Sequence, residues 1–405
     1  MSKFDTYFLM KAEDAIEYAQ LKVPQKDWDA ASMTCKEIGD GNLNYVFKVQ
    51  DGKGHSVIIK QAGTVTRISE DMKLDTDRNR IESEILVLQG KLAPGYVPEI
   101  YFYDTVMSAC GMQDLSDHMI MRTAMLEHKI YPKFADQIST FMAQVLMGTT
   151  DVVMDHQEKK ALQRKFINPE LCDITEALVY TEPYNDELGR NNVYPPVAAF
   201  VKEKLYGDEE LHCEVAKLKM DFMTRAQSLI HGDLHTGSIF INEDTTMVFD
   251  PEFCFYGPMG YDIGNVIANM IFAWCNGDVH GDKEFCAWVE SVIRDVINLT
   301  MEKMSAYYDE HVTDTMCKSK AYKDYYMSTI LADTAAVSGL EMIRRIVGMA
   351  NVKDITTIAD EAARARAEKI CITAGIDFIK NRGEKKCGNC FLATLKDAVA
   401  AVDAQ

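Results

Sequence analysis

Residues 231–238 read His-Gly-Asp-Leu-His-Thr-Gly-Ser, and residues 247–252 read Met-Val-Phe-Asp-Pro-Glu. Short apolar runs flank both stretches within an otherwise helical pattern, which predicts two short strands or loops that carry chemistry. The carboxylate of Asp233 can orient a hydroxyl group and accept its proton. Asp250 stands seventeen residues after Asp233. Because residues i and i+2 of a strand point to the same face, Asp250 and Glu252 can both aim oxygen ligands at one Mg²⁺ ion.

The stretch 231–238 is similar to the catalytic loop of protein kinases, in which His-Arg-Asp is followed by a metal-binding asparagine five residues later. This similarity places Asp233 in the position of the catalytic base. Ser238 stands where the kinase pattern has asparagine, and a hydroxyl group is a poorer magnesium ligand than a carboxylate. We therefore expect Asp250 and Glu252 to supply most of the protein ligands of the Mg²⁺ in Mg-ATP. We expect Asp233 to support in-line transfer of the γ-phosphoryl group.

The first hundred residues differ from the rest of the chain. Residues 43–50 and 56–61 are rich in β-branched and aromatic residues, and Asp51-Gly52-Lys53-Gly54 separates them. This pattern predicts a β-hairpin. A helical stripe that ends near residue 92 and a short strand near residues 100–103 follow.

After about residue 115 the pattern is mostly helical, with long periodic segments near residues 132–149, 195–206, 284–306, 322–349 and 356–380. We predict an α+β, bilobal protein-kinase-like fold. Residues 1–112 would form a small β-rich, ATP-binding lobe, and residues 113–405 would form a larger helical lobe for catalysis and substrate binding.

Several residues of the first lobe are candidates for binding ATP. A glycine-containing turn directly before a strand lets backbone amides approach phosphate oxygens. Lys60 ends the next strand in the string Val-Ile-Ile-Lys, which resembles the phosphate-binding lysine strand of kinases. The following helix offers Glu82 and Glu84 to hold the ammonium group of Lys60, and Glu82 fits better. Backbone groups near the end of the lobe would pair with the adenine edge. The candidates are Gly39, Asp40, Gly41, Asn42, Asn44, Lys60, Glu82, Gln113 and Leu115.

Residues 231–238, 250–264 and 38–47 together resemble the signatures of the 5-methylthioribose kinases, and the likeness covers nearly the whole chain. The resemblance implies ATP- and Mg²⁺-dependent phosphorylation of the anomeric hydroxyl of methylthioribose, in methionine salvage, by a homodimer. It also implies that Asp262 is a buried structural residue that ties the catalytic loop to a helix.

An adjacent arginine pair, Arg344 and Arg345, lies in an apolar helical stretch and matches the active-site arginine pair of that family. The guanidinium groups would stabilise charge on the phosphoryl group and contact the substrate. Because adjacent helical residues point about 100° apart, the two need not have the same role. His235 is expected to be a loop-packing residue.

Two other classes of function remain open. One is a different small-molecule kinase of the same fold, such as a homoserine, choline or aminoglycoside kinase. An arginine pair does not suit the cationic choline or aminoglycoside, whereas the carboxylate of homoserine is compatible with it. The other is an inactive, kinase-shaped binding protein. It is disfavoured because Lys60, Asp233, Asp250 and Glu252 are all present.

The composition excludes some classes of binding partner. The 43 Lys and Arg residues against 62 Asp and Glu residues give a net charge of −19, which repels nucleic acid and anionic membranes. No secretory signal is apparent, and eleven irregularly spaced cysteines are typical of buried, reduced thiols. We therefore expect a cytoplasmic protein with no nucleic-acid or membrane partner. Cys387 and Cys390 have the spacing of half a zinc site, but we expect a reduced or disordered tail there.

Overall fold

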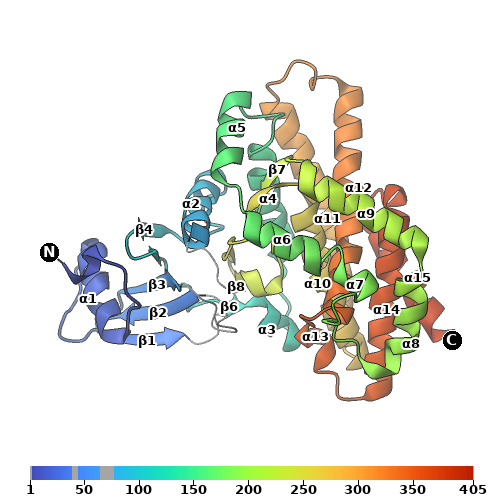
Figure 1. Ribbon diagram of the computed structural model, residues 1–405, viewed down its shortest axis with the longest axis horizontal. Coiled ribbons are helices and arrows are strands. Elements are labelled where there is room, and N and C mark those ends of the chain that lie inside the picture. The colour runs from blue at the N-terminus through green and yellow to red at the C-terminus, as the bar shows by residue number, and fades with distance from the viewer. Residues whose placement is uncertain (1, 39–43, 64–76, 405) are drawn as a thin grey trace. The chain divides into compact units, whose positions relative to one another are not determined.

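The computed structural model describes residues 2–38, 44–63 and 77–404, with the side chains of residues 77 and 78 left out (Figure 1). The expected phosphate-loop residues Gly39, Asp40, Gly41 and Asn42 lie outside these residues. By packing, the chain forms two compact units. The first is Met1–His118 with Met247–Cys254, and the second is Met119–Thr246 with Phe255–Gln405. Packing alone groups residues 113–118 and 247–254 with the first unit. The expected division into two lobes after residue 112 stays a prediction.

The first unit contains a five-stranded antiparallel sheet in the order β1-β2-β3-β5-β4. Its elements are α1 (Ala12–Lys22), β1 (Thr34–Ile38), β2 (Asn44–Gln50), β3 (Ser56–Ala62), α2 (Asp77–Leu92), β4 (Ile100–Asp104) and β5 (Ala109–Met112). The predicted hairpin is confirmed as β2 and β3. Asp51 shapes its turn, since its carboxylate accepts the backbone N–H groups of Lys53 and His55. Gly54 supplies the positive φ of 89° that the turn requires.

Helix α1 closes the core of the first unit, although the sequence pattern did not predict this helix. Phe47, Val49, Val57 and Ile59 of the hairpin are at most 1% exposed and pack in one cluster with Tyr18 of α1. The hydroxyl of Tyr18 donates to the carboxylate of Asp104 at 2.8 Å. A buried hairpin is therefore the base from which Lys60 projects.

The second unit is mainly helical. Its helices are α3 (Met121–Leu126), α4 (Phe134–Gly148), α5 (His156–Lys165), α6 (Pro169–Leu178), α7 (Glu182–Asn185), α8 (Ala198–Val201), α9 (Glu209–Thr224), α10 (Gly260–Val279), α11 (Lys283–His311), α12 (Lys320–Val347), α13 (Lys353–Thr356), α14 (Glu361–Lys380) and α15 (Gly388–Asp403). Helix α12 packs between α10 and α14 (Figure 1). Glycines allow this close packing. A Cβ atom on Gly264 would lie 2.8 Å from the Ser338 nitrogen, and one on Gly339 would lie 2.3 Å from the Gly375 carbonyl oxygen.

Short strands bracket the catalytic loop of the second unit. Strand β7 (Ser228–Ile230) pairs with β10 (Phe255–Gly257), and β6 (Met119–Ile120) pairs with β8 (Ile239–Ile241). Strand β9 (Thr246–Val248) is the third strand of the β6-β8-β9 sheet, and the boundary between the two units falls within it. Residues 231–238 therefore leave one buried strand and enter another, as their flanking apolar runs predict.

The end of the chain differs from the expectation. The possibility of a disordered tail at Cys387 and Cys390 is wrong, because α15 begins at Gly388 and packs against α11 and α14. The backbone N–H of Gly388 donates to Asn298 of α11 at 2.9 Å, which fixes the start of the helix. The two cysteine sulfurs lie 3.5 Å apart. Among the described residues, none of the helices is both long and apolar enough to cross a membrane.

Candidate active site

The catalytic loop is anchored by Asp262, two residues into α10. Its carboxylate accepts the backbone N–H of His231 at 2.7 Å and that of Gly232 at 3.0 Å. Gly232 has a φ of 82°, which glycine adopts without the cost that a side chain would add. Burial raises the pKa of Asp262 despite these bonds. The predicted tie between this aspartate and the loop is confirmed.

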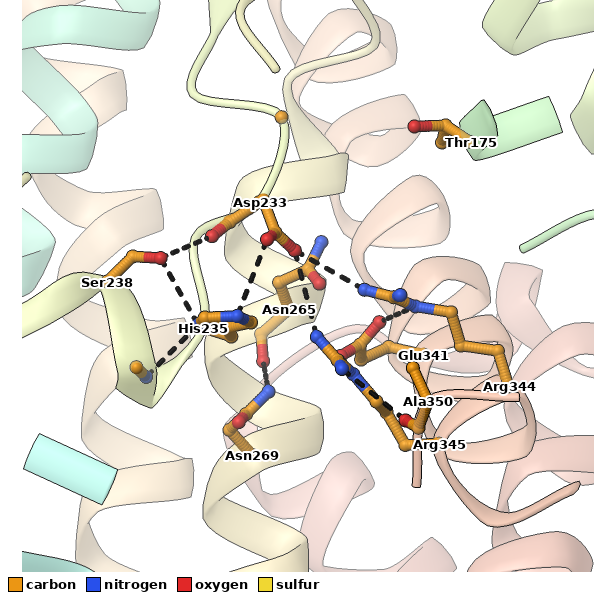
Figure 2. A network of polar contacts seen from close by, with 12 residues as sticks. Thr175, Asp233, His235, Ser238, Asn265, Asn269, Glu341, Arg344, Arg345 and Ala350 are labelled. Carbon is orange, nitrogen blue, oxygen red and sulfur yellow. Dashed lines mark hydrogen bonds and ion pairs between the residues drawn. The ribbon is translucent and has the colours of Figure 1, made fainter. Parts of the chain in front are cut away.

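Asp233 lies at the centre of a polar network formed by the loop and the end of α12 (Figure 2). One carboxylate oxygen lies 3.3 Å from Nη2 of Arg344 and 3.8 Å from Nη2 of Arg345, and the other lies 3.4 Å from Nε2 of His235. Burial alone would raise the pKa of Asp233, but the imidazole of His235 and the guanidinium charges of Arg344 and Arg345 beside it lower this pKa below its usual value. Asp233 is therefore a carboxylate across the physiological pH range.

Arg344 and Arg345 converge on one buried carboxylate, although adjacent helical residues leave the axis in different directions. Glu341, which is 1% exposed, accepts a hydrogen bond from Nε of Arg344 through one oxygen and from Nε of Arg345 through the other, the latter at 2.9 Å. Glu341 stands three and four residues before the arginines, so all three share one face of the helix. Arg345 also donates to the carbonyl of Ala350 at 3.4 Å (Figure 2). The arginines are thus prearranged, with Arg344 nearer to Asp233.

His235 does more than pack the loop. Its Nδ1 accepts the backbone N–H of Gly237 at 3.0 Å, so a neutral ring carries its proton on Nε2, the atom that faces Asp233. Burial lowers the pKa of His235 to about 4, and the charges of Arg345 and Arg122 add to this effect against the opposing charge of Asp233. The imidazole is therefore neutral at physiological pH, and its Nε2 faces the carboxylate of Asp233 at 3.4 Å.

Ser238 is occupied within the loop. Its hydroxyl donates to the carbonyl of Asp233 at 3.0 Å and lies 3.2 Å from Nδ1 of His235. This arrangement agrees with the expectation that serine contributes less to metal binding than asparagine would at this position.

Within the first unit, Lys60 lies between two carboxylates. Its ammonium is 2.8 Å from Glu82 and forms a short contact with Asp250. The predicted pairing with Glu82 is confirmed, whereas Glu84 instead accepts from Arg80 on the same helix. Burial disfavours the charge on Lys60, but nearby carboxylates, first of all Asp250, raise its pKa well above the usual value. The lysine is therefore held in its charged form.

The strand argument for Asp250 and Glu252 is wrong. Strand β9 ends at Val248, and Asp250 adopts a left-handed conformation with φ of 66°. The pleat does not reach these residues, and a turn places both carboxylates where they act on the charge of Lys60. The amide of Asn44 donates to Glu252 at 3.4 Å. The Asp250 side chain is 36% exposed, so two hard-oxygen donors, one of them accessible, fit the ligand preference of Mg²⁺.

The expected adenine contacts fall just after β5. The backbone N–H of Gln113 donates to the Glu99 carbonyl at 2.8 Å, and the Leu115 carbonyl accepts the N–H of His118 at 2.9 Å. Within the described part of the chain, the Gln113 carbonyl and the Leu115 N–H form no other backbone hydrogen bond, so one acceptor and one donor are open there.

Two polar residues of this site, Glu341 and Arg122, were not predicted from the sequence, and neither was the approach of His235 Nε2 to Asp233. The signal for Glu341 was its spacing from the arginine pair, which is typical of helical ion pairs. Arg122 is more than one hundred residues from the catalytic loop in the chain and carries no local signal.

Comparison with known proteins identifies the family. Residues 34–285 match the model of the phosphotransferase enzyme family. The methylthioribose kinase of Erwinia tasmaniensis is 38% identical over 385 residues, which cover 94% of this chain and 95% of that protein. The methylthioribose kinase of Yersinia enterocolitica is 36% identical over 386 residues, with 94% and 95% coverage.

A solved structure supports the fold independently. Choline kinase from Cryptosporidium parvum has a TM-score of 0.51 at 12% identity, with 96% of each chain covered. At this identity the likeness concerns the fold alone, and it confirms the predicted α+β, protein-kinase-like fold with a small sheet-containing part and a larger helical part. The expected resemblance is confirmed as well: this chain belongs to the phosphotransferase enzyme family and, within it, to the methylthioribose kinase family.

Proposed function

We propose that this protein is an ATP-dependent kinase that phosphorylates the 1-hydroxyl group of 5-methylthioribose, a reaction of methionine salvage. The observation that carries the proposal is the partly buried network in which Asp233 faces two arginines held by Glu341. A carboxylate beside two guanidinium groups suits a neutral hydroxyl acceptor that becomes a phosphate ester. The full-length similarity to methylthioribose kinases supports the choice of acceptor.

In the proposed mechanism, Asp233 accepts a hydrogen bond from the 1-hydroxyl group and orients its oxygen for in-line attack on the γ-phosphorus. The new P–O bond forms as the bond to the β-phosphate oxygen breaks, and the hydroxyl proton passes to Asp233. Because its pKa is held low, Asp233 is a weak base that takes the proton late, when the hydroxyl has become acidic. The Nε2–H of the neutral His235 faces the carboxylate at 3.4 Å and helps to orient it.

Arg344 and Arg345 supply positive charge to the phosphoryl group during transfer and to the sugar phosphate that results. Their Nε atoms are committed to Glu341, so their terminal nitrogens are the groups directed toward the reacting atoms. Since Glu341 fixes the guanidinium groups before substrate arrives, little reorganisation is needed at the moment of reaction.

Lys60 binds the α- and β-phosphates of ATP in this proposal, with Glu82 keeping its ammonium in place. Asp250 and Glu252 would hold Mg²⁺, which would offset the negative charge of the phosphates. Asn44, which donates to Glu252, supports this carboxylate from the start of β2. The Gln113 carbonyl and the Leu115 N–H bind the adenine edge. Gly39, Asp40, Gly41 and Asn42, which lie outside the described residues, stay candidates for binding the phosphates.

We also propose a homodimer in the cytoplasm. The dimer follows from the resemblance to the family. A reducing compartment agrees with the eleven cysteines, which are all free thiols. Sedimentation of the purified protein tests the dimer, since a monomeric mass at micromolar concentration would contradict it.

The experiment that tests the function is a coupled ADP-release assay with methylthioribose, choline, homoserine and kanamycin as acceptors. Phosphorus NMR of the product would locate the new ester. We expect turnover with methylthioribose and a phosphate on its anomeric oxygen. Turnover with only one of the other acceptors would replace the proposed substrate, and no turnover with bound ATP would favour a binding protein.

A further inference from the structure

A third arginine, Arg122, lies beside the catalytic loop. It is the second residue of α3, directly after β6, and β6 pairs with β8, the strand that leaves the loop. Met119 lies opposite Ile241 and Ile120 lies opposite Phe240 in this pairing. The strand register therefore carries Arg122 to the catalytic loop, although the two are far apart in the sequence.

The guanidinium of Arg122 packs against Gly237. A Cβ atom at this glycine would lie 2.9 Å from both Cζ and Nη2 of Arg122, and 2.7 Å from Cε1 of His235. Such distances are too short for real contacts, so a residue with a side chain cannot occupy position 237 unless its neighbours move. The guanidinium is thus adjacent to the imidazole that faces Asp233.

Arg122 lacks the partners that the other two arginines have. Arg344 and Arg345 both donate to Glu341. Within the described ranges, Arg122 forms no hydrogen bond and no ion pair, and its Nε is buried. Arg122 is half-buried, and a buried N–H donor without an acceptor, such as its Nε, is costly. The arrangement is therefore incomplete until an oxygen-bearing molecule supplies acceptors.

The charged groups around Arg122 also favour a bound oxygen-bearing molecule. Burial lowers the pKa of Arg122, and the positive charge of Arg345 lowers it further, while Asp354, Asp233 and Glu341 oppose this effect. Asp354 is 2% exposed, and its Oδ2 has no hydrogen-bond partner among the described residues. A polyhydroxyl molecule carries both acceptors for the guanidinium and donors for a carboxyl group.

We propose that Arg122 is a further substrate-contacting residue, whose guanidinium donates hydrogen bonds to oxygen atoms of the acceptor molecule held at Asp233. This inference rests on the proposed kinase function and names a residue beyond the pair on α12. The acceptor offers two kinds of oxygen: the ring hydroxyls of the sugar before transfer, and the phosphoryl oxygens during and after transfer. The planar fork of arginine suits either kind.

The test uses Arg122→Met, Arg122→Lys and Gly237→Ala in the full-length protein. Calorimetry measures binding of methylthioribose, of its 1-phosphate and of ATP, and steady-state kinetics separates kcat from KM. If Arg122 binds hydroxyls, Arg122→Met weakens sugar binding at least tenfold. If it binds the phosphoryl group, kcat and affinity for the 1-phosphate fall at least tenfold while sugar binding is unchanged. In both cases ATP affinity stays within twofold of wild type.

Two variants guard against a trivial loss of folding. Arg122→Lys keeps the charge without the fork and should lie between wild type and Arg122→Met. Gly237→Ala displaces the guanidinium. It should therefore lower whichever quantity Arg122→Met lowers, either the affinity for the sugar or kcat and the affinity for the 1-phosphate. Arg364, on α14, is a matched control because it is partly buried and binds Glu368 at 2.9 Å away from the loop. Arg364→Met should leave all these constants unchanged.

Three outcomes would overturn the inference: no change in sugar binding, product binding or kcat in Arg122→Met; a loss confined to ATP; or an equal loss in Arg364→Met. Failure of the proposed function is distinguishable, because the wild-type protein itself would then not phosphorylate methylthioribose.

Discussion

Replacing Glu341 with glutamine tests whether the arginine pair must be held in advance. Glu341 makes two charge-assisted hydrogen bonds, one to each arginine, and such bonds contribute about 1.5–3 kcal/mol each. Glutamine keeps one acceptor oxygen but presents an N–H group to the other guanidinium. One bond is lost and two donors face each other. Because the pair is buried, we expect a loss of about 3–5 kcal/mol in the free energy of unfolding.

The same change should reduce catalysis without weakening ATP binding. One guanidinium would no longer be held in place, and losing one preorganised donor typically costs about 10²–10³-fold in kcat. We therefore expect kcat of Glu341→Gln to fall by about 10²–10³-fold, with the ATP dissociation constant within twofold of wild type. Stopped assays below the melting temperature, together with urea unfolding curves, measure both effects.

Two further variants separate positioning from general destabilisation. Glu341→Asp keeps the charge, so its kcat should be at least tenfold higher than that of Glu341→Gln. Glu368 of α14 is a matched control, since it is 2% exposed and accepts from Arg364 at 2.9 Å. Glu368→Gln should lower stability without lowering kcat. A kcat of Glu341→Gln within threefold of wild type, in folded protein, would refute the reasoning.

Three other changes have defined outcomes. Glu82→Gln should raise KM for ATP at least tenfold, because the lysine ammonium loses a partner, while Glu84→Gln on the same helix should not; equal effects would contradict the pairing. Asp250→Asn should raise the Mg²⁺ concentration for half-maximal rate more than tenfold, with Glu252→Gln behaving similarly, and an unchanged magnesium titration would exclude this metal site. Burial raises the pKa of Asp354 to about 6, above the pKa of this group in the unfolded chain. The contribution of Asp354 to stability is therefore full below about pH 4 and is lost as pH rises through about 6. The free energy of unfolding of Asp354→Asn, measured with urea, should therefore rise by up to about 3 kcal/mol relative to wild type between pH 4 and 7. A pH-independent difference between the two proteins would contradict this.

Local patterns predicted the elements that depend on neighbouring residues. The hairpin follows from its turn residues, and Lys60 and Glu82 follow from a strand and helix in known order. Asp262 was correctly assigned because the motif that contains it occurs as a unit. Glu341 was accessible from its spacing to the arginines but was overlooked.

Tertiary contacts and backbone strain explain what the sequence did not reveal. Arg122 meets the catalytic loop only because β6 pairs with β8. The conformation of Asp250, with φ of 66°, breaks the strand pattern on which the sequence argument relied. The ring nitrogen of His235 that carries the proton depends on which one accepts the Gly237 N–H. These features arise from packing and not from periodicity.

The most direct test of the account is the turnover of Asp233→Asn with methylthioribose and Mg-ATP. Asparagine keeps the shape of the side chain but cannot accept the hydroxyl proton. A positioned base contributes about 10²–10⁴-fold, so we predict a fall in kcat of at least about 10², with ATP binding unchanged by calorimetry. Near-normal turnover of this variant, with ATP binding intact, would contradict the assignment of Asp233 as the base.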